Sequence, residues 1–330
     1  MSGTRLDVLA IGDAVVDVIA TASDDFLAAE GLVKGSMQVL DAEGATRLYA
    51  QMRQARETSG GSAANTMAGV AALGGRAGFV GQVADDQLGE IFTHDIRALG
   101  VEFLTPPKSG GEPTGRCLIL VTPDAQRTMN TFRGAAHELS AEALDADQIR
   151  DAAILYLEAY LWRSAGPRAA MEEAMEIAHA AGRKVAFTLS DIACIKPHRA
   201  EMIAMLKAGA IDLLFANENE IRELADTPDR DSAIAVIAPN VPLLVVTCGA
   251  EGALAVERGR TVRTPIARIG QGIVDTTGAG DLFAAGFLVG QAEGRGLEQS
   301  LRMGAIAAAE VISHFGARPE ADLKALVAAS

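Results

Sequence analysis

The sequence predicts an α/β protein with a mostly parallel sheet that is covered by helices on both faces. Short apolar segments bounded by Gly, Asp or Asn recur along the 330-residue chain, and such segments are typical of buried strands. Alanine-rich segments with helical spacing lie between them. Strands that alternate with helices form βαβ units, so these strands are expected to run parallel.

The individual elements follow from this pattern in chain order. We expect strands at 7–12, 77–83, 153–157, 184–189, 212–216 and 243–247. We expect helices between them at 62–74, 86–98, 166–181 and 198–207. A last long helix is predicted at 297–315, because Gly316 is a suitable C-cap and Pro319 follows it.

Two segments, 14–40 and 101–133, interrupt the alternation of strands and helices. The second is rich in Pro and Gly before two runs of alternating polarity, 116–121 and 127–133, which indicate antiparallel strands. We expect the two segments to form a small β lid. The remaining α/β core then comprises residues 1–13, 41–100 and 134–330.

Composition argues against several classes of partner and location. The net charge of −14, without a basic stripe, makes a nucleic acid or an anionic membrane an unexpected partner. Cys117, Cys194 and Cys248 are far apart and form no CxxC pair, which argues against a disulfide framework or a zinc site and fits the cytoplasm. Because Arg5 and Asp7 lie at the first apolar stretch, we expect neither a signal peptide nor a membrane span there.

The most informative segment, 275–281, reads Asp-Thr-Thr-Gly-Ala-Gly-Asp and precedes an apolar run. We expect a tight turn that leads into a helix, whose unpaired N–H groups and dipole attract an anion. Gly278 and Gly280 would let a phosphate approach the backbone. Asp281 would be stabilised as a carboxylate in the first helical turn, where it could accept a proton. A loop with an acidic helix start is the alternative interpretation of a bare GxGD.

The whole stretch 275–288 resembles the second signature pattern of the ribokinase/PfkB carbohydrate-kinase family. This resemblance implies a ribokinase-like three-layer fold and an ATP-dependent kinase. It implies that Gly278, Ala279 and Gly280 form the anion hole for the transferred phosphoryl group, and that Asp281 is the general base. It also places a monovalent cation such as K⁺ near Asp275.

A Gly-Gly pair before a predicted helix also resembles a family motif. By this resemblance Gly60 and Gly61 form the hinge between lid and core, and Asn65 binds hydroxyls of the phosphoryl acceptor. A simple turn before a helix is the structural alternative.

An NxxE motif follows the strand predicted at 212–216. By resemblance, Asn217 and Glu220 hold water molecules on Mg²⁺, because residues three apart share one face of a helix. An N-capped helix with an acidic first turn explains the same residues without a metal.

Two further features resemble parts of the family's ATP site. The loop that contains Thr247, Gly249 and Gly252 is similar to the TxGxxG loop that lies along the ATP phosphates and ribose. Arg127, in the second strand region of the lid, resembles a lid arginine that reaches the ATP phosphates. A turn after a strand and a solvated strand charge are the respective alternatives.

The N-terminal segment 11–20 resembles the opening of the adenosine kinases, a branch of this family. In that comparison Asp17 holds the ribose 2′- and 3′-hydroxyls. Asp13 stands where Asn is usual, and its role is left open between a substrate contact and a solvated turn acid.

A purine would also need apolar walls and a stacking face. By resemblance, Tyr160 and Leu161 flank the base and Leu40 from the lid covers it. Ordinary core or rim packing is the alternative for these side chains.

The leading interpretation is transfer of the ATP γ-phosphoryl group, with Mg²⁺, to the 5′-hydroxyl of a purine nucleoside, first of all adenosine, by a monomer or homodimer. An inosine/guanosine kinase, a sugar or sugar-acid kinase, and a catalytically silent nucleoside sensor remain as alternatives. Retention of Asp281 argues against the sensor, because binding alone needs no base. The sequence carries no GxxxxGK[ST], no GxGxxG after a strand and no HRD or DFG set, which disfavours other nucleotide-binding folds.

Overall fold

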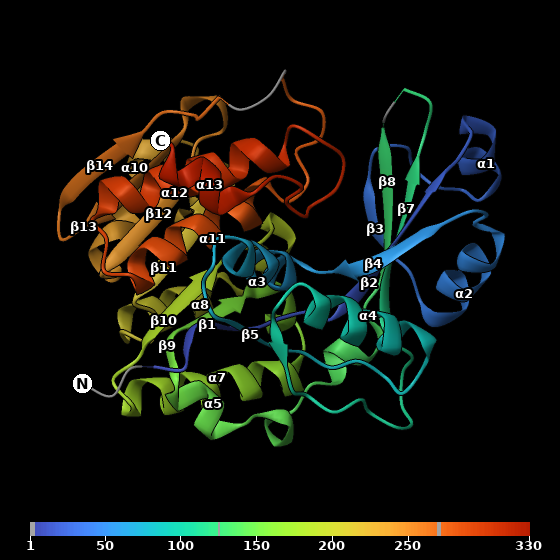
Figure 1. The fold of residues 1–330 in the computed structure, drawn as a ribbon, viewed down its shortest axis with the longest axis horizontal. Coiled ribbons are helices and arrows are strands. Elements are labelled where there is room, and N and C mark those ends of the chain that lie inside the picture. Colours follow the sequence, from blue (N-terminus) through green and yellow to red (C-terminus); the bar gives the residue numbers. More distant parts are fainter. Residues whose placement is uncertain (1–3, 125, 269–271) are drawn as a thin grey trace.

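The computed structural model describes residues 4–124, 126–268 and 272–330, which form two β-sheets and the helices around them (Figure 1). The larger sheet has nine strands in the order β14-β13-β12-β11-β10-β9-β1-β5-β6. The smaller sheet has five strands in the order β3-β8-β7-β2-β4. In Figure 1 the larger sheet and most of the helices lie on the left, and the smaller sheet lies on the right.

The larger sheet is mostly parallel, as predicted. Its parallel strands are β12 (Leu243–Thr247), β11 (Leu213–Asn217), β10 (Lys184–Thr188), β9 (Ala152–Glu158), β1 (Leu6–Ile11), β5 (Ala77–Val80) and β6 (Glu102–Phe103). At one edge, β13 (Ala253–Glu257) and β14 (Arg260–Thr264) add an antiparallel ribbon that was not predicted. The predicted α/β fold class is therefore confirmed.

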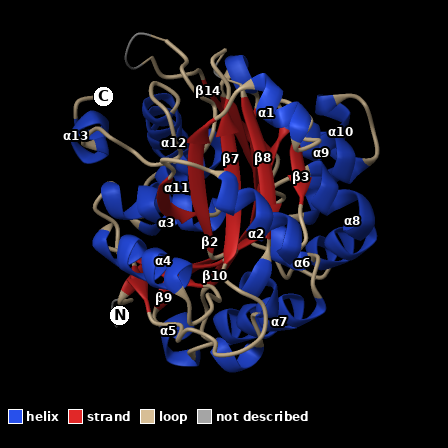
Figure 2. Cartoon of the chain, turned by 90° about the vertical axis from the view of Figure 1, so that its right-hand side faces the viewer, coloured by secondary structure: helices blue, strands red, loops and turns tan. Residues whose placement is uncertain are grey.

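Helices cover both faces of the larger sheet and produce three layers (Figure 2). Successive residues of β1 point to opposite faces, so Val8 and Ala10 pack in one apolar cluster, and Leu9 and Ile11 pack in the other. The first cluster includes α3 (Ser62–Ala72), α11 (Ala279–Ala292), α12 (Leu297–Val311) and α13 (Leu323–Ala328). The second includes α6 (Ala159–Trp162), α7 (Ala165–Ala180), α8 (Ile192–Lys207), α9 (Glu218–Ala225) and α10 (Arg230–Ile237).

The predicted helices are present, with two shifted ends. The helix expected at 198–207 begins at Ile192, because the Asp191 carboxylate caps it by accepting the N–H of Ala193, and Pro197 lies inside it. The helix expected at 297–315 ends at Val311. Two helices, α4 (Gln87–Ala98) and α5 (Ala146–Arg150), complete the core. In the part of the chain that the structure describes, no helix is both long and apolar enough to span a membrane.

The smaller sheet forms a separate β layer beside the carboxyl ends of the parallel strands. Its strands are β2 (Val15–Thr21), β3 (Met37–Val39), β4 (Arg56–Gly60), β7 (Gly115–Val121) and β8 (Arg127–Phe132), and it is accompanied by α1 (Asp24–Ala29) and α2 (Ala42–Gln51). The strands β7 and β8 pair antiparallel, as the alternating polarity indicated.

The smaller sheet includes more of the chain than the expected lid. The strand β4 pairs antiparallel with β2, although residues 41–100 were assigned to the core. Conversely, β6 pairs with β5 in the larger sheet, although 101–133 was assigned to the lid. The sequence of β4, Arg-Glu-Thr-Ser-Gly, lacks an apolar alternation, so only its pairing partner defines it as a strand.

Candidate active site

A cavity of about 730 Å³ lies between the two sheets. One wall comes from the smaller sheet and contains Asp17, Met37, Val39, Ile119 and Met129 among others. The opposite wall comes from the carboxyl ends of β10, β11 and β12 and from the start of α11. Ligands of open α/β sheets bind at this edge, so the cavity is the candidate active site.

The start of α11 forms the floor of this cavity. Gly278 is the N-cap residue and has a left-handed φ of 77°, and a Cβ there would lie 2.7 Å from the Cβ of Ala317. A Cβ added at Gly280 would meet no atom within 4 Å, so its backbone borders open space. Gly278, Ala279 and Gly280 all line the cavity. Their position at a helix N-terminus suits the binding of an anion.

Asp281 is held in place from α3. Ser62 Oγ donates to Asp281 Oδ1 at 2.6 Å, and Asn65 Nδ2 donates to Asp281 Oδ2 at 2.9 Å. Burial raises the pKa of the Asp281 carboxyl, while these two hydrogen bonds and the charge of Arg318 lower it, and the net shift is upward. A raised pKa brings a carboxylate base closer to the working pH and increases its tendency to take a proton.

Ser62 was not predicted as a site residue. Its only sequence signal is its position directly after the Gly-Gly pair, which does not reveal a partner 219 residues away. Asn65, which was predicted to bind the acceptor, also lines the cavity, and its Oδ1 is buried without a hydrogen-bond partner among the described residues. An acceptor hydroxyl could satisfy that oxygen.

Glu158, at the end of β9, is a second residue that the sequence analysis missed. Its side chain is 0% exposed, and it accepts the backbone N–H of Asp13 at 2.6 Å and that of Ala63 at 2.7 Å. It therefore joins two points where the chain passes between the sheets. Burial, and next the charge of Asp13, raise the pKa of the Glu158 carboxyl well above its usual value.

Asp13 and Asp17 both line the cavity, as expected for residues that contact the acceptor. Asp13 Oδ1 lies 3.4 Å from His137 Nε2. Burial raises the pKa of Asp17 to about 6, against the charges of Arg318 and Arg127, which lower it. Gly60 lies directly beside Asp17, and any Cβ at Gly60 would clash with the Asp17 carboxylate.

The two glycines predicted as a hinge have different surroundings. Gly61 lines the cavity and has a φ of 96°, whereas Gly60 ends β4. A Cβ at Gly61 would also clash with the carbonyl oxygen of Asp13. Position 61 therefore requires glycine, because its backbone conformation is left-handed and it passes close to the backbone of Asp13, whereas a side chain at Gly60 would displace the Asp17 carboxylate.

The structure places only one of the three residues predicted for the base pocket at the cavity. Tyr160 lines the cavity, but Leu161 is fully buried in the core and does not. These two residues lie in the short helix α6, where successive side chains point about 100° apart, so only one of them faces the cavity. Leu40 is half-buried and packs on the core cluster, and Met37 and Val39 line the cavity in its place.

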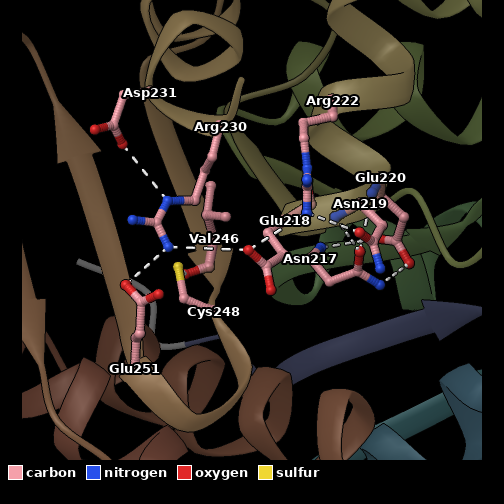
Figure 3. A network of polar contacts seen from close by, with 10 residues as sticks. All are labelled: Asn217, Glu218, Asn219, Glu220, Arg222, Arg230, Asp231, Val246, Cys248 and Glu251. Carbon is pink, nitrogen blue, oxygen red and sulfur yellow. Dashed lines mark hydrogen bonds and ion pairs between the residues drawn. The ribbon is translucent and has the colours of Figure 1, made fainter. Parts of the chain in front are cut away.

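Asn217 and Glu220 form reciprocal hydrogen bonds at the start of α9 (Figure 3). Asn217 N donates to Glu220 Oε2 at 2.9 Å and Asn217 Nδ2 donates to Glu220 Oε1 at 2.6 Å. Glu220 N donates in return to Asn217 Oδ1 at 2.9 Å. This capping box agrees with the alternative interpretation, an N-capped helix with an acidic first turn. Both side chains also line the cavity, however.

Glu220 is 6% exposed, and burial raises its pKa to about 7, with smaller contributions from the charges of Asp191 and Asp281. Because both carboxylate oxygens already accept protein N–H groups, the residue suits a contact through water better than direct metal ligation. Within residues 4–124, 126–268 and 272–330, no group of three or more His, Cys, Asp or Glu side chains could hold a metal ion.

The predicted ATP loop lies beside this network. Thr247 lines the cavity, whereas Gly249 and Gly252 do not, and both have positive φ values, 53° and 90°. Arg230 Nη1 lies 2.9 Å from Glu251 Oε2 and 3.9 Å from Glu218 Oε2 (Figure 3). Arg230 thus connects the loop to the start of α9.

Arg127 and Asp275, predicted for different ligands, bind each other. Arg127 Nη2 lies 2.7 Å from Asp275 Oδ2, and their side chains are 11% and 8% exposed. Asp275 also accepts the N–H of Gly316 at 2.9 Å, and both the N–H and the hydroxyl of Thr277, at 3.1 and 2.7 Å. Neither residue lines the cavity. The ion pair joins β8 of the smaller sheet to the turn before α11.

Comparison with known proteins agrees with this geometry. The family model "pfkB family carbohydrate kinase" matches residues 6–323. The crystal structure of adenosine kinase from Sinorhizobium meliloti is 46% identical with a TM-score of 0.91, covering 98% of this chain and 99% of that chain. A 5-dehydro-2-deoxygluconokinase from Shouchella clausii is 28% identical over 98% of this chain and 96% of its own length.

A third comparison concerns the fold alone. A Ribokinase II candidate from Escherichia coli, solved in complex with ATP and Mg²⁺, is 20% identical with a TM-score of 0.80, and the match covers 98% of this chain and 99% of that one. The predicted family resemblance is confirmed by the match over nearly the whole chain. The chain therefore belongs to the pfkB family of carbohydrate kinases, which transfer a phosphoryl group to an alcohol.

Proposed function

We propose that the chain transfers the γ-phosphoryl group of ATP to the 5′-hydroxyl of a purine nucleoside, with adenosine as the first acceptor to test. The observation that carries this proposal is the position of Asp281. Its carboxylate is held by Ser62 and Asn65 at the N-terminus of α11, inside a cavity lined by Asp13 and Asp17. The proposed base, a helix start that suits an anion and the proposed hydroxyl-binding side chains thus border one cavity.

In the proposed reaction, Asp281 accepts the proton of the attacking hydroxyl as the oxygen bonds to the γ-phosphorus. The bond from that phosphorus to the bridging oxygen of ADP breaks at the same time. The N–H groups at 278–280 would stabilise the negative charge on the transferred phosphoryl oxygens. Asn65 would orient the acceptor through its unpartnered Oδ1.

ATP is proposed to lie along Thr247 and the following loop, with its phosphates directed towards Gly278. Glu220 and Asn217 would hold the water molecules of a Mg²⁺ ion, which would supply positive charge to neutralise the ATP phosphates. The buried carboxylate of Glu220 at the cavity wall fits this indirect contact. A monovalent cation beside Asp275 would have to coexist with the Arg127 ion pair.

The smaller sheet is proposed to act as a lid that excludes water during transfer, with Gly60 and Gly61 at the hinge. Its strands supply one wall of the cavity, so a tilt of this sheet would open or close the acceptor site. The contact between Arg127 and Asp275 would favour the closed arrangement, because it joins the far end of the lid to the core.

Adenosine leads because the adenosine kinase from S. meliloti is similar over 98% of this chain. The cavity wall also suits a purine, since Tyr160 offers an aromatic face and Met37, Val39, Ile119 and Met129 line the cavity. A sugar-acid kinase is the second candidate. It is favoured by the 5-dehydro-2-deoxygluconokinase of S. clausii, which matches 98% of this chain.

A panel of acceptors tests the proposal. The purified protein with ATP and Mg²⁺ is assayed for ADP release with adenosine, inosine, guanosine, ribose, fructose and 2-keto-3-deoxygluconate. We expect kcat/KM for a purine nucleoside to exceed that for the free sugars by roughly ten- to a hundredfold, because the sugars leave the apolar wall unfilled. A sugar that equals or exceeds every nucleoside would overturn the nucleoside assignment.

A further inference from the structure

Two arginines in the cavity have no role in the mechanism described above. Arg133 follows β8 of the smaller sheet, and Arg163 follows α6 at the carboxyl end of β9. Both line the cavity, so they approach it from opposite walls. Arg133 is half-buried and Arg163 is exposed.

Neither guanidinium has a partner in the part of the chain that the structure describes. Among the residues that the structure describes, neither side chain forms an ion pair or a hydrogen bond. Arg127, Arg199 and Arg230, by contrast, each pair with a carboxylate. Partial burial of the Arg133 guanidinium without a partner carries a desolvation cost, and an acceptor group on a ligand would offset that cost.

The electrostatics of this end of the cavity favour a ligand with hydrogen-bond acceptor atoms. Burial, and next the charge of Arg163, lower the pKa of Arg133, while the charge of Asp13 opposes them. The two guanidinium groups therefore repel each other across the same space. Asp13 and Asp191 also line the cavity, but neither forms an ion pair with these arginines.

The arginines lie at the acceptor side of the cavity, away from the predicted ATP loop. His137, four residues after Arg133, lies with its Nε2 atom 3.4 Å from Oδ1 of Asp13, which is predicted to contact the acceptor. The Nδ1 atom of His137 lies 2.6 Å from the hydroxyl of Ser164, the residue directly after Arg163. When the reacting hydroxyl lies at Asp281, the opposite end of the acceptor extends towards these side chains. They are thus suited to recognise that far end.

We propose that Arg133 and Arg163 are specificity-determining residues that bind a group of adjacent hydrogen-bond acceptor atoms at the far end of the phosphoryl acceptor. Arginine has only donors, and its planar fork fits two acceptor atoms side by side. The O6 and N7 atoms of a 6-oxopurine present such a pair, as does a carboxylate. Adenine presents N7 next to an amino donor, so it can accept only one of the two bonds.

The nucleoside part of this inference depends on the proposed function, whereas the carboxylate part does not. The test therefore compares Arg133→Met and Arg163→Met with the unchanged protein on inosine, guanosine, adenosine, ribose and 2-keto-3-deoxygluconate. Arg302→Met is the matched control, because Arg302 is exposed on α12 and does not line the cavity. Thermal unfolding of each variant checks that it is folded.

We expect each cavity variant to lower kcat/KM for the preferred acceptor roughly ten- to a hundredfold, mainly through KM, with KM for ATP unchanged. The loss should be larger for inosine or guanosine than for adenosine, and ribose should be affected less than either. Arg133→Lys and Arg163→Lys should restore only part of the activity, because lysine keeps the charge but not the planar fork.

The outcomes separate the two proposals. If 2-keto-3-deoxygluconate is the substrate and both variants lose its phosphorylation, the arginine site stands and the nucleoside assignment falls. If nucleosides are phosphorylated and the variants behave like Arg302→Met, the arginine site falls and the nucleoside assignment stands. An equal loss on every acceptor, ribose included, also overturns the site, since it would indicate a structural role. If no acceptor of either class is phosphorylated or bound in calorimetry, both proposals fall.

Discussion

Replacing Asp281 with asparagine removes the proposed base while keeping the shape of the side chain. The new amide oxygen can still accept from Ser62 Oγ. The new amide nitrogen would face Asn65 Nδ2, but Asn65 can turn its own amide, because its Oδ1 has no partner among the described residues. Both contacts to the side chain at 281 can therefore persist. The turned Asn65 would present Nδ2 instead of Oδ1 to the acceptor, so a small change in KM for the acceptor should accompany the loss of proton transfer.

The magnitude follows from the role of a positioned base. Its removal typically slows a reaction about 10²- to 10⁴-fold, which corresponds to roughly 3 to 5 kcal/mol of activation free energy. We expect most of this loss in kcat, with KM for ATP and for the acceptor changed no more than a few-fold. The measurement is steady-state ADP release with the best acceptor of the panel, together with ATP binding by calorimetry.

Asp322→Asn is the matched control, because Asp322 caps α13 through its side chain and asparagine caps equally well. The control should retain the kcat of the unchanged protein. A kcat for Asp281→Asn within a few-fold of the unchanged protein would refute the assignment of the base. So would a large loss that appears only as weaker binding.

Four further predictions, from three variants, concern the base, the lid and the proposed metal contact. Ser62→Ala removes a hydrogen bond that lowers the pKa of Asp281, so the acidic limb of the kcat/KM profile should move to higher pH; an unchanged limb would exclude Asp281 as the titrating group. Arg127→Met breaks the ion pair with Asp275, so amide hydrogen exchange in the smaller sheet should become faster while exchange in the core strands stays the same. Equal protection in the variant and the unchanged protein would show that this ion pair does not hold the smaller sheet against the core. Glu220→Gln should raise the Mg²⁺ concentration needed for half-maximal rate, and an identical titration would remove Glu220 from the metal site. Burial raises the pKa of the Glu220 carboxyl to about 7, so ionisation of this buried group destabilises the folded protein as the pH rises towards that value. The neutral glutamine avoids this cost. Glu220→Gln should therefore have a higher melting temperature than the unchanged protein at pH 8 but not at pH 5.

Local pattern was sufficient to predict the layers of the core. The strands of the larger sheet are short apolar runs buried on both faces, and their helices carry regular apolar spacing, so each segment indicates its own structure. The shifted start of α8 has a local cause as well. The Asp191 cap lies ahead of Pro197, a residue that would normally be expected near a helix start.

The smaller sheet was harder to delimit because its outer strand has no pattern of its own. The strand β4 is polar and short, and it becomes a strand only through its pairing with β2. The ribbon of β13 and β14 was missed for a related reason, since it adds an antiparallel edge to a sheet that otherwise follows the βαβ rhythm. Pairing between distant segments is a tertiary property.

The sequence by itself determined the fold class and the family, and it predicted Asp281 as the base, because each depends on a contiguous pattern of residues. Only the tertiary structure decided which side chains meet Asp281 and which line the cavity. Ser62 lies 219 residues from Asp281, and Glu158 reaches Asp13 across 145 residues. Leu161 and Tyr160 are neighbours in sequence, yet the turn of α6 directs one to the core and the other to the cavity. The direction of a side chain depends on how its element is rotated and packed, and that rotation is set by contacts with parts of the chain that no local pattern specifies.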